Sequence, residues 1–380
     1  MKLTATPAIV DLNPNAAGAE IIIPTRGGSS DPLLDAKKLH SISTLESTNG
    51  IPNHLFASSQ YNTFYNAPVI ADLDDNGSYG VIIHEENGGS EERLRYFDLN
   101  NPLQNWTSNS NIGKGQGMPI AADLDNDGNK EIIIGTKTTT EAQGGIYIFA
   151  HDGDPFYNND PLVYTNQTSG TDHLFDCAPL AVDLDSDGTL EIVFMSAYND
   201  KISTIGRVFA MHVVNGEPVF LDDWGYEDHI INLSQKGLEA WLPALAVADL
   251  NEDGLYEVIT GDDGQLHIWK NTGEVFSANW PVSIDGYQGC YMSPLVADVD
   301  EDDDLEIIAP DHMRRIHAFN LDGSVVDHWP LQLEDPLYGT PCIGDVDEDG
   351  KNEIMAGAGN KMYMWDTEGD ANRIAWGHTG

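Results

Sequence analysis

Basic residues are scarce in this chain: 18 Lys and Arg stand against 62 Asp and Glu among 380 residues, for a formal net charge of −44. Nucleic acids and anionic membrane surfaces are bound through a basic face, so this balance argues against both as partners. No run of about 18 apolar residues is present, which argues against membrane insertion. A surface this acidic repels itself unless cations neutralise part of the charge.

Cysteine, helical periodicity and catalytic motifs are also rare or missing. The three cysteines, Cys177, Cys290 and Cys342, lack metal-type spacing and stand beside apolar strand residues, so we expect buried thiols that pack as small hydrophobic groups. Only the stretches around 33–39 and 230–241 could hold a helical turn. No Gly-x-Ser-x-Gly, His-Glu-x-x-His or phosphate loop is present.

What the sequence has in abundance is an internal repeat. Six segments align without a gap, from APVIADLDDNGSYGVII to TPCIGDVDEDGKNEIMA, and a further copy, TPAIVDLNPNAAGAEIII, needs one inserted residue. The repeats start near residues 7, 68, 119, 179, 244, 294 and 341. A period of roughly 45 to 65 residues is the length of a propeller blade, whereas solenoid repeats are usually shorter or helical.

Each period has the pattern of short strands. A small apolar strand precedes an aspartate, a β-branched strand follows the acidic loop, and a third strand alternates with aromatics, as in LHIWKNTG. A fourth strand often carries tryptophan, at Trp224, Trp280, Trp329 and Trp376. We predict an all-β, seven-bladed β-propeller of four-stranded antiparallel blades, forming one domain over residues 1–380. The recurring aromatics are most simply packing between blades, with sugar stacking as the alternative.

Two ways of closing the ring of blades are compatible with the sequence. Residues 2–6 could pair with the last blade, and residues 373–376 could instead complete that blade unaided.

An acidic loop joins the first and second predicted strands, and in the best copies it is Asp-x-Asp-x-Asp-Gly-x-x-Glu. Alternate residues of a tight loop direct side-chain oxygens to one centre, and glycine in the sixth position permits a positive φ. The seventh position supplies a backbone carbonyl as a metal ligand, and the side chain in the ninth position completes the coordination shell. Oxygen ligands without His or Cys favour calcium over transition metals. We expect several structural calcium ions, with metal-free acidic turns as the alternative.

The copies differ in quality. The fifth has an amide in place of one carboxylate, the sixth has Asp303 where glycine is expected, and the second has Gly80 in the ninth position. The first has Pro14 and an insertion, so it is not expected to bind a metal. The predicted ligands, carbonyl donors included, are Asp72, Asp74, Asn76; Asp123, Asp125, Asp127, Asn129, Glu131; Asp183, Asp185, Asp187, Thr189, Glu191; Asp249, Asn251, Asp253, Leu255, Glu257; Asp298, Asp300, Asp302, Asp304, Glu306; and Asp345, Asp347, Asp349, Lys351, Glu353.

These repeats resemble the FG-GAP/VCBS family, known from the integrin α-chain propeller, from lectins and from many secreted bacterial proteins. The resemblance covers all seven repeats and rests on the Pro-x-x-x-Asp strand followed by Asp-x-Asp-x-Asp-Gly-x-x-Glu. The Phe-Gly and Gly-Ala-Pro signatures of the integrin version are mostly missing, so the chain looks closer to the bacterial VCBS type. The resemblance implies a propeller with calcium in its loops and no single ligand, because function on this scaffold lies in grafted loops.

The calcium loops favour an extracellular or cell-surface location, where calcium is millimolar, although residues 1–7 lack the apolar stretch of a signal peptide. We expect the chain to be part of a larger secreted protein.

A ligand surface is predicted over repeats one to four, because the loops between the second and third strands, and the links between blades, are long there. Aromatic faces with Asn, Gln and Asp neighbours suit a carbohydrate, and flat acidic loops suit an extracellular protein partner. Tolerated insertions without a role are the alternative. The predicted ligand residues are Tyr61, Tyr65, Trp106, His173, Tyr198, Tyr226 and Trp241.

The sequence thus favours a non-catalytic binding or adhesion module over an enzyme. The alternative is a polysaccharide lyase, because some rhamnogalacturonan lyases resemble this repeat and use calcium. Such chemistry needs a metal or Arg to neutralise a uronate and a His, Lys or Tyr base. Candidates without a spaced motif are Arg93, Arg95, Lys114, His173, Lys201, Arg207 and His229. A purely structural propeller is a third possibility, which the sequence does not separate from a lectin.

Overall fold

The computed structural model describes residues 8–10, 20–24, 39–48, 51–57, 67–85, 92–98, 102–115, 117–138, 142–165, 173–174, 178–199, 204–222, 224, 229–233, 244–285, 292–300, 302–311, 313–337 and 339–376. The chain divides into two compact units, each taken by itself below: Met1–Pro179 with Val213–Pro218, and Leu180–His212 with Val219–Gly380. Among the described residues, no helix is long and apolar enough to cross a membrane.

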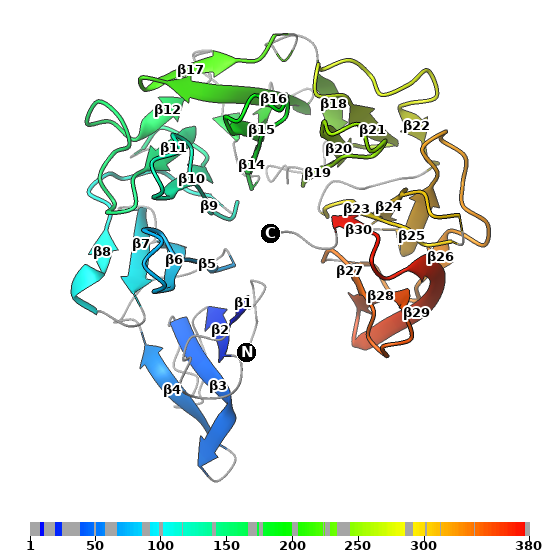
Figure 1. The fold of residues 1–380 in the computed structure, drawn as a ribbon, viewed down its shortest axis with the longest axis horizontal. Coiled ribbons are helices and arrows are strands. Elements are labelled where there is room, and N and C mark those ends of the chain that lie inside the picture. Colours follow the sequence, from blue (N-terminus) through cyan, green and yellow to red (C-terminus); the bar gives the residue numbers. More distant parts are fainter. Residues whose placement is uncertain are drawn as a thin grey trace. The chain divides into compact units, whose positions relative to one another are not determined.

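The described part of the first unit contains three four-stranded antiparallel sheets, and Figure 1 shows the strands of each sheet in chain order. The sheets consist of β1 (Ala8–Val10), β2 (Glu20–Pro24), β3 (Leu39–Thr48) and β4 (Ile51–Ala57); of β5 (Val69–Ala71), β6 (Gly80–Glu85), β7 (Arg93–Asp98) and β8 (Trp106–Thr107); and of β9 (Ile120–Ala122), β10 (Glu131–Gly135), β11 (Ile146–Phe149) and β12 (Leu162–Tyr164). A short strand, β13 (His173–Leu174), and a 3-10 turn, η2 (Pro102–Gln104), complete the elements described there.

The second unit continues the same order of strands. Its sheets consist of β14 (Leu180–Val182), β15 (Glu191–Asn199), β16 (Thr204–Val214), β17 (Glu217–Phe220) and β18 (Ile230–Leu233); of β19 (Ala246–Ala248), β20 (Glu257–Gly261), β21 (Gln265–Trp269) and β22 (Val282–Ser283); of β23 (Leu295–Ala297), β24 (Glu306–Asp311), β25 (Arg315–Phe319), β26 (Leu331–Gln332) and β30 (Ile374–Trp376); and of β27 (Cys342–Gly344), β28 (Lys351–Ala358) and β29 (Lys361–Asp370). In repeats two to seven the acidic loop joins the first and second strands, as predicted.

The cores lie between neighbouring sheets of each unit. Second strands such as β10 and β24 have an apolar centre, at 132–134 and 307–310, and every residue of either strand is buried. One cluster joins Ile82 and Leu94 of one sheet to Ile132 and Phe149 of the next. Equivalent clusters connect the β19–β22 sheet to the β23–β26 sheet, and the β23–β26 sheet to β27–β29. Each sheet therefore buries apolar side chains against its neighbour, as the strand patterns predict.

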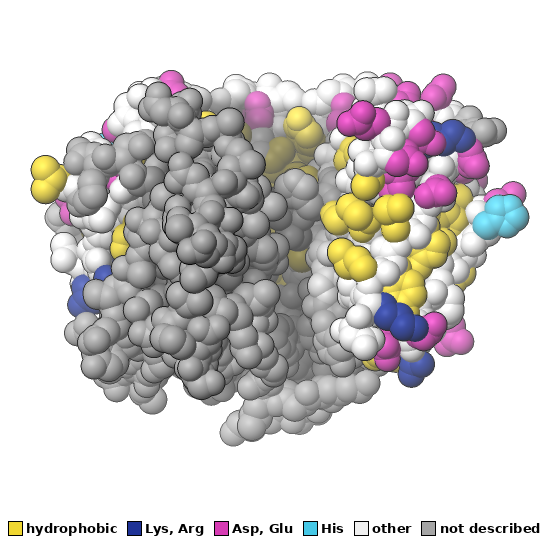
Figure 2. Space-filling model, turned by 90° about the horizontal axis from the view of Figure 1, so that it is seen from below, with side chains coloured by type: hydrophobic (Ala, Val, Ile, Leu, Met, Phe, Trp, Pro, Cys, Tyr) yellow, Lys and Arg dark blue, Asp and Glu magenta, His cyan; other side chains and the backbone are white. Residues whose placement is uncertain are grey.

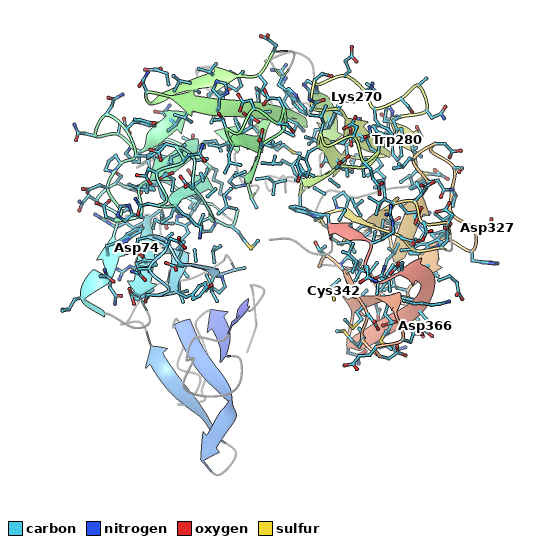
Figure 3. All side chains as sticks on the ribbon, viewed as in Figure 1. Asp74, Lys270, Trp280, Asp327, Cys342 and Asp366 are labelled. Carbon is cyan, nitrogen blue, oxygen red and sulfur yellow. The ribbon has the colours of Figure 1, made fainter. Side chains whose placement is uncertain are left out.

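A tryptophan hydrogen bond recurs between neighbouring sheets. Each indole N–H donates to the carbonyl two residues after the third strand of the next sheet: Trp106 to His151 at 3.0 Å, Trp224 to Asn271 at 2.7 Å and Trp280 to Leu321 at 2.9 Å. Trp224 and Trp280 are buried, and Figure 3 shows Trp280 among the side chains between the two sheets that it joins. The prediction that these two aromatics pack between blades is confirmed.

Three local expectations are wrong. Residues 230–233 form the strand β18 rather than a helical turn, and the stretch 195–207, taken as a long loop, is largely a hairpin because β15 and β16 extend into it. Cys342 is half-buried, not buried, as are the other residues of its strand β27. Cys177 and Cys290 lie outside the described residues.

The C-terminal strand does not complete the last repeat. β30 pairs with β23 of the preceding repeat, with Trp376 opposite Val296 and Ile374 opposite Ala297. Among the described residues, the sheet of the seventh repeat therefore has three strands, β27–β28–β29. The face of β29 that carries Met362, Met364 and Asp366 stays exposed, and Figure 2 shows apolar and acidic side chains together on this part of the surface.

Candidate metal centres

The loops of repeats two, three, four, five and seven share one hydrogen-bonded conformation. In the third, Asp123 Oδ1 accepts the N–H of Asp127 at 3.1 Å and Oδ2 accepts the N–H of Gly128 at 3.0 Å. The same pair of bonds recurs at Asp72, Asp183, Asp249 and Asp345. The first aspartate therefore folds the loop around its own carboxylate. The glycine in the sixth position has a φ between 83° and 93° in these five loops, which explains why glycine stands there.

The glutamate in the ninth position lies buried beneath the loop. In repeats three to seven its Oε2 accepts the N–H of the second loop residue, as Glu131 does from Leu124 at 2.9 Å. This bond fixes the carboxyl group and leaves Oε1 available to the loop. In the sixth repeat, Oε1 of Glu306 is buried without a hydrogen-bond partner, and in the fourth, Oε1 of Glu191 makes no hydrogen bond but lies 3.7 Å from Nδ1 of His212. A buried polar oxygen without a hydrogen bond is costly unless something else binds it.

Acidic oxygens converge in four of the loops. In each, three ligand atoms lie within 4.8 Å of one another: Asp123, Asp125 and Asp127; Asp183, Asp185 and Glu191; Asp298, Asp300 and Asp302; Asp345, Asp347 and Glu353. These are the third, fourth, sixth and seventh repeats. The fifth has an amide at Asn251 and the second has no acid in the ninth position, which explains why neither supplies three acids of this kind. The donor set fits a hard divalent cation.

Burial and mutual repulsion shape the titration of these loops. Burial, followed by the charges of the loop aspartates, raises the pKa of Glu131 and Glu191 to about 7, and that of Glu306 to about 8. The pKa of Glu257 is raised to about 7, again chiefly by burial. Without a cation, these carboxyls therefore hold protons close to neutral pH, and a divalent ion would compete with those protons.

Without a cation, we expect the free energy of unfolding to fall as the pH rises from about 4.5 to about 7. In this window the buried glutamates of the folded chain still hold protons that ordinary glutamates of the unfolded chain, with a pKa of about 4.3, have released, so rising pH favours unfolding. Calcium binding at about pH 6 should release protons. Melting in chelator across this range, and calorimetric calcium titration in two buffers of different ionisation enthalpy, measure both effects. A binding enthalpy independent of the buffer would contradict the prediction.

Backbone geometry at two loop positions adds to the sequence motif. Asp303, in the place of glycine, has a φ of 63°, which confirms that aspartate can adopt the left-handed conformation there. The fourth position is also left-handed in five loops, with φ from 50° to 63°, at Asp75, Asn126, Ser186, Glu252 and Glu348. The motif leaves this position undefined, so the sequence analysis missed it. Only Asp75 and Asn126 are residue types that favour this conformation, so residue type gave little signal.

The second loop replaces its missing acid with a phenol. A Cβ on Gly80 would lie 2.0 Å from the ring of Tyr96, so Tyr96 fills the space that the ninth side chain occupies elsewhere. Burial, and then the charges of Asp98, Asp74 and Asp72, raise the pKa of Tyr96 and keep it neutral. The ammonium group of Lys130, in the third repeat, donates a hydrogen bond to the backbone carbonyl of Asp72 at 2.9 Å. These contacts favour a second loop that holds a cation more weakly than the others.

The residues predicted to lend carbonyls have a visible role through their N–H groups. In each of these loops, the backbone N–H of the seventh residue donates to the carboxylate of the aspartate in the fifth position. The pairs are Asn129 to Asp127, Thr189 to Asp187, Leu255 to Asp253, Asp304 to Asp302 and Lys351 to Asp349. This bond orients the carboxylate of the fifth position. That the carbonyls bind a metal stays a prediction.

Most of the predicted ligand surface lies outside the described residues, including Tyr61, Tyr65, Tyr226 and Trp241. For His173 and Tyr198, the backbone alone is described, in β13 and β15. Trp106 stacks on Tyr96, with ring centroids 5.7 Å apart, and bonds the carbonyl of His151. Its described contacts are those of packing, and its ligand role stays a prediction.

Several of the basic residues considered for lyase chemistry make contacts within or between the sheets. Arg93 donates to the carbonyl of Ser108 at 2.7 Å, and Arg95 forms an ion pair with Glu85. His229 stacks on Trp224, and its Nε2 lies 2.8 Å from the carbonyl of Gly273. Lys201 lies outside the described residues.

Acid–base contacts at the far ends of the second and third strands escaped the sequence analysis. Asp311, at the end of β24, accepts hydrogen bonds from Arg315 Nε at 2.9 Å and lies 2.9 Å from His317 Nε2. Asp262 and His267 form the same pair in the preceding sheet, at 3.1 Å. Glu85 and Arg95 occupy the equivalent places in the sheet of β5–β8. We call these three sets the strand-end locks.

Comparison with known proteins gives a family model and several similar structures. A family model described as FG-GAP-like repeat matches residues 249–309, from the fifth acidic loop through the sixth. Among curated proteins, no sequence matches the chain. BamB from Moraxella catarrhalis is similar in structure, with a TM-score of 0.53 and 16% identity, over 96% of this chain and 85% of that chain.

Two further solved structures are similar at lower scores. The V. cholerae biofilm matrix protein Bap1 has a TM-score of 0.46 and 12% identity, over 100% of this chain and 88% of that chain. The Dos1 propeller has a TM-score of 0.49 and 10% identity, over 96% of this chain and 90% of that chain. At such identities, likeness in structure shows the fold alone.

Proposed function

Since the chain is a β-propeller of the FG-GAP-like repeat type, we propose that it is a non-catalytic binding module stabilised by several structural calcium ions. The observation that carries the proposal is the convergence of three acidic ligand atoms within 4.8 Å in each of four loops. Oxygen donors without His or Cys are the ligands that calcium prefers. Recurrence favours a structural role, because a catalytic metal is needed at one site beside a substrate cleft.

The position of the loops explains what calcium would stabilise. In the third repeat, Asp123 follows the first strand β9 and Glu131 begins the second strand β10. A cation held by both ends of the loop would join the two strands where their ladder begins. It would also neutralise carboxylates in a chain whose net charge is −44.

We place this module outside the cell or at its surface, as part of a larger secreted protein, because loops of this kind suit millimolar calcium. Its ligand is a carbohydrate or an extracellular protein. The long loops of repeats one to three would bind it, since in the chain each of them joins the second and third strands, whereas the calcium loop joins the first and second. This assignment rests on loop length and on the aromatic residues of those loops.

A glycan-array screen in millimolar calcium and in chelator tests the proposal. We expect glycan binding that is lost with chelator and unchanged by Asp327→Ala, an exposed substitution on the β25–β26 connection (Figure 3). Calcium binding without glycan binding would favour a protein partner. Incubation with uronate polysaccharides is the control for catalysis, and an unsaturated product absorbing in the ultraviolet would replace the binding module with a lyase.

A further inference from the structure

The end of β29 and the turn that leads into the C-terminal strand β30 contact the sixth acidic loop directly. The N–H of Asp370 donates to Asp298 Oδ2 at 2.9 Å, and the N–H of Asp298 donates to the carbonyl of Arg373 at 2.9 Å. Asp298 is the first aspartate of its loop, and it is almost fully buried. A segment from outside the repeat therefore binds both the side chain and the backbone of a predicted metal ligand.

The sixth loop differs in this from the other acidic loops. Elsewhere the carboxylate of the first aspartate accepts two N–H groups from the fifth and sixth positions of its own loop, as Asp345 does from Asp349 and Gly350. In the sixth loop, Asp298 Oδ1 accepts the N–H of Asp300 at 3.1 Å, and Asp370 supplies the other bond. The carboxylate of Asp298 thus receives from β29 the N–H that other loops provide themselves.

Close packing around this contact shows that it is built into the fold. The amide of Asn352, which is fully buried, donates to the carbonyls of Asp298 at 3.0 Å and Asp370 at 2.8 Å. A Cβ on Gly369 would lie 2.1 Å from the carbonyl oxygen of Asp298, so only glycine allows this approach. Beyond it, β30 pairs with β23, and the indole of Trp376 donates to Ser293 Oγ at 3.1 Å.

The sixth loop also has the features of a cation site. Ligand atoms of Asp298, Asp300 and Asp302 lie within 4.8 Å of one another. Oε1 of the fully buried Glu306 has no hydrogen-bond partner, and its Oε2 is fixed by the N–H of Val299 at 2.9 Å. Without a cation, three carboxylates at this distance repel one another, and that repulsion acts on the same Asp298 that holds Asp370.

We propose that cation binding in the sixth loop and docking of the C-terminal segment 369–376 are coupled, so that each strengthens the other. A cation removes the repulsion that would move Asp298 away from Asp370. Docking in turn fixes the Asp298 carboxylate in the position from which it binds the cation. This coupling is reciprocal by thermodynamic necessity. It rests on the proposed function only in that the acidic loops bind calcium.

Hydrogen exchange of the full chain, in calcium and in chelator, tests the coupling. We expect calcium to slow exchange of the amides in 370–376 by roughly 5- to 150-fold, the range of typical coupling energies. The double variant Asp300→Asn with Asp302→Asn should abolish this effect. The matched double variant Asp125→Asn with Asp127→Asn, in the third loop, should keep it. Equal protection of 370–376 in both variants, or equal loss, would overturn the proposal.

The same experiment separates this inference from the proposed function. Amides of 123–131 report calcium binding in the third loop, far in sequence from the C-terminal segment. If they are protected by calcium while 370–376 do not respond, the coupling is wrong and calcium binding stands. If no loop responds, both are wrong. As a second variant, Trp376→Ala leaves the loop intact and should speed exchange at 298–306 in calcium, and no change there would contradict the reciprocal effect.

Discussion

Removal of calcium is expected to lower the melting temperature of the chain by about 20 °C, the largest effect that we predict. An ion that binds the folded chain alone adds about 2.7 kcal/mol when its concentration is 100 times its Kd. Four loops bring three acidic ligand atoms together, so the total is on the order of 10 kcal/mol. That is comparable to the whole stability of a typical domain. In large domains, 1 kcal/mol changes the melting temperature by about 2–4 °C, and less as size increases.

Differential scanning calorimetry in calcium and in chelator, with magnesium as the comparison ion, measures this effect. Magnesium demands stricter geometry and gives up water reluctantly, so we expect it to restore little of the stability. The double variant Asp183→Asn with Asp187→Asn should lose about 5 °C in calcium, because it disables one loop of four. In chelator, the same variant should melt no lower than the unmodified chain. Identical melting with and without calcium would mean that the loops are acidic turns without a metal.

The strands and the acidic loops could be predicted from the sequence because their determinants are local. A strand such as 131–135 is a β-branched run, and glycine in the sixth loop position marks a left-handed residue, both visible within a few residues. Tertiary packing agrees with these local preferences, so the expected strands β10 and β24 form as buried second strands.

The features that escaped prediction depend on contacts between distant segments. The pairing of β30 with β23 joins residues about 80 positions apart, and several edges with short apolar strands were available to it. The space left by Gly80 is filled by Tyr96 from a different strand. The strand-end locks depend on register, because Asp311 lies beside Arg315 and His317 only when β24 and β25 pair as they do. None of these partners follows from a sequence pattern.

The second large effect is expected from breaking the strand-end lock of the sixth repeat. Asp311 is fully buried and accepts bonds from the backbone N–H and the Nε of Arg315, and it contacts His317 Nε2. Asp311→Ala leaves the basic groups without their acid, and removing one partner of a buried ion pair costs about 3–5 kcal/mol. Since 25% of the Arg315 side chain is exposed, water relieves part of the cost, and we expect about 3 kcal/mol.

Urea unfolding in excess calcium measures this loss separately from the metal sites. Asp327→Ala is the matched control, since it removes an exposed aspartate of the connection between β25 and β26, and it should change the stability by less than about 0.5 kcal/mol. Asp311→Asn keeps a hydrogen-bond acceptor without the charge, so its cost should lie between those of the two alanine variants. If Asp311→Ala costs no more than Asp327→Ala, then Arg315 and His317 find water or other acceptors when the acid is lost. The contacts of Asp311 would in that case order the ends of β24 and β25 without stabilising the fold. The equivalent contact between Asp262 and His267 would then not be expected to stabilise the fold either.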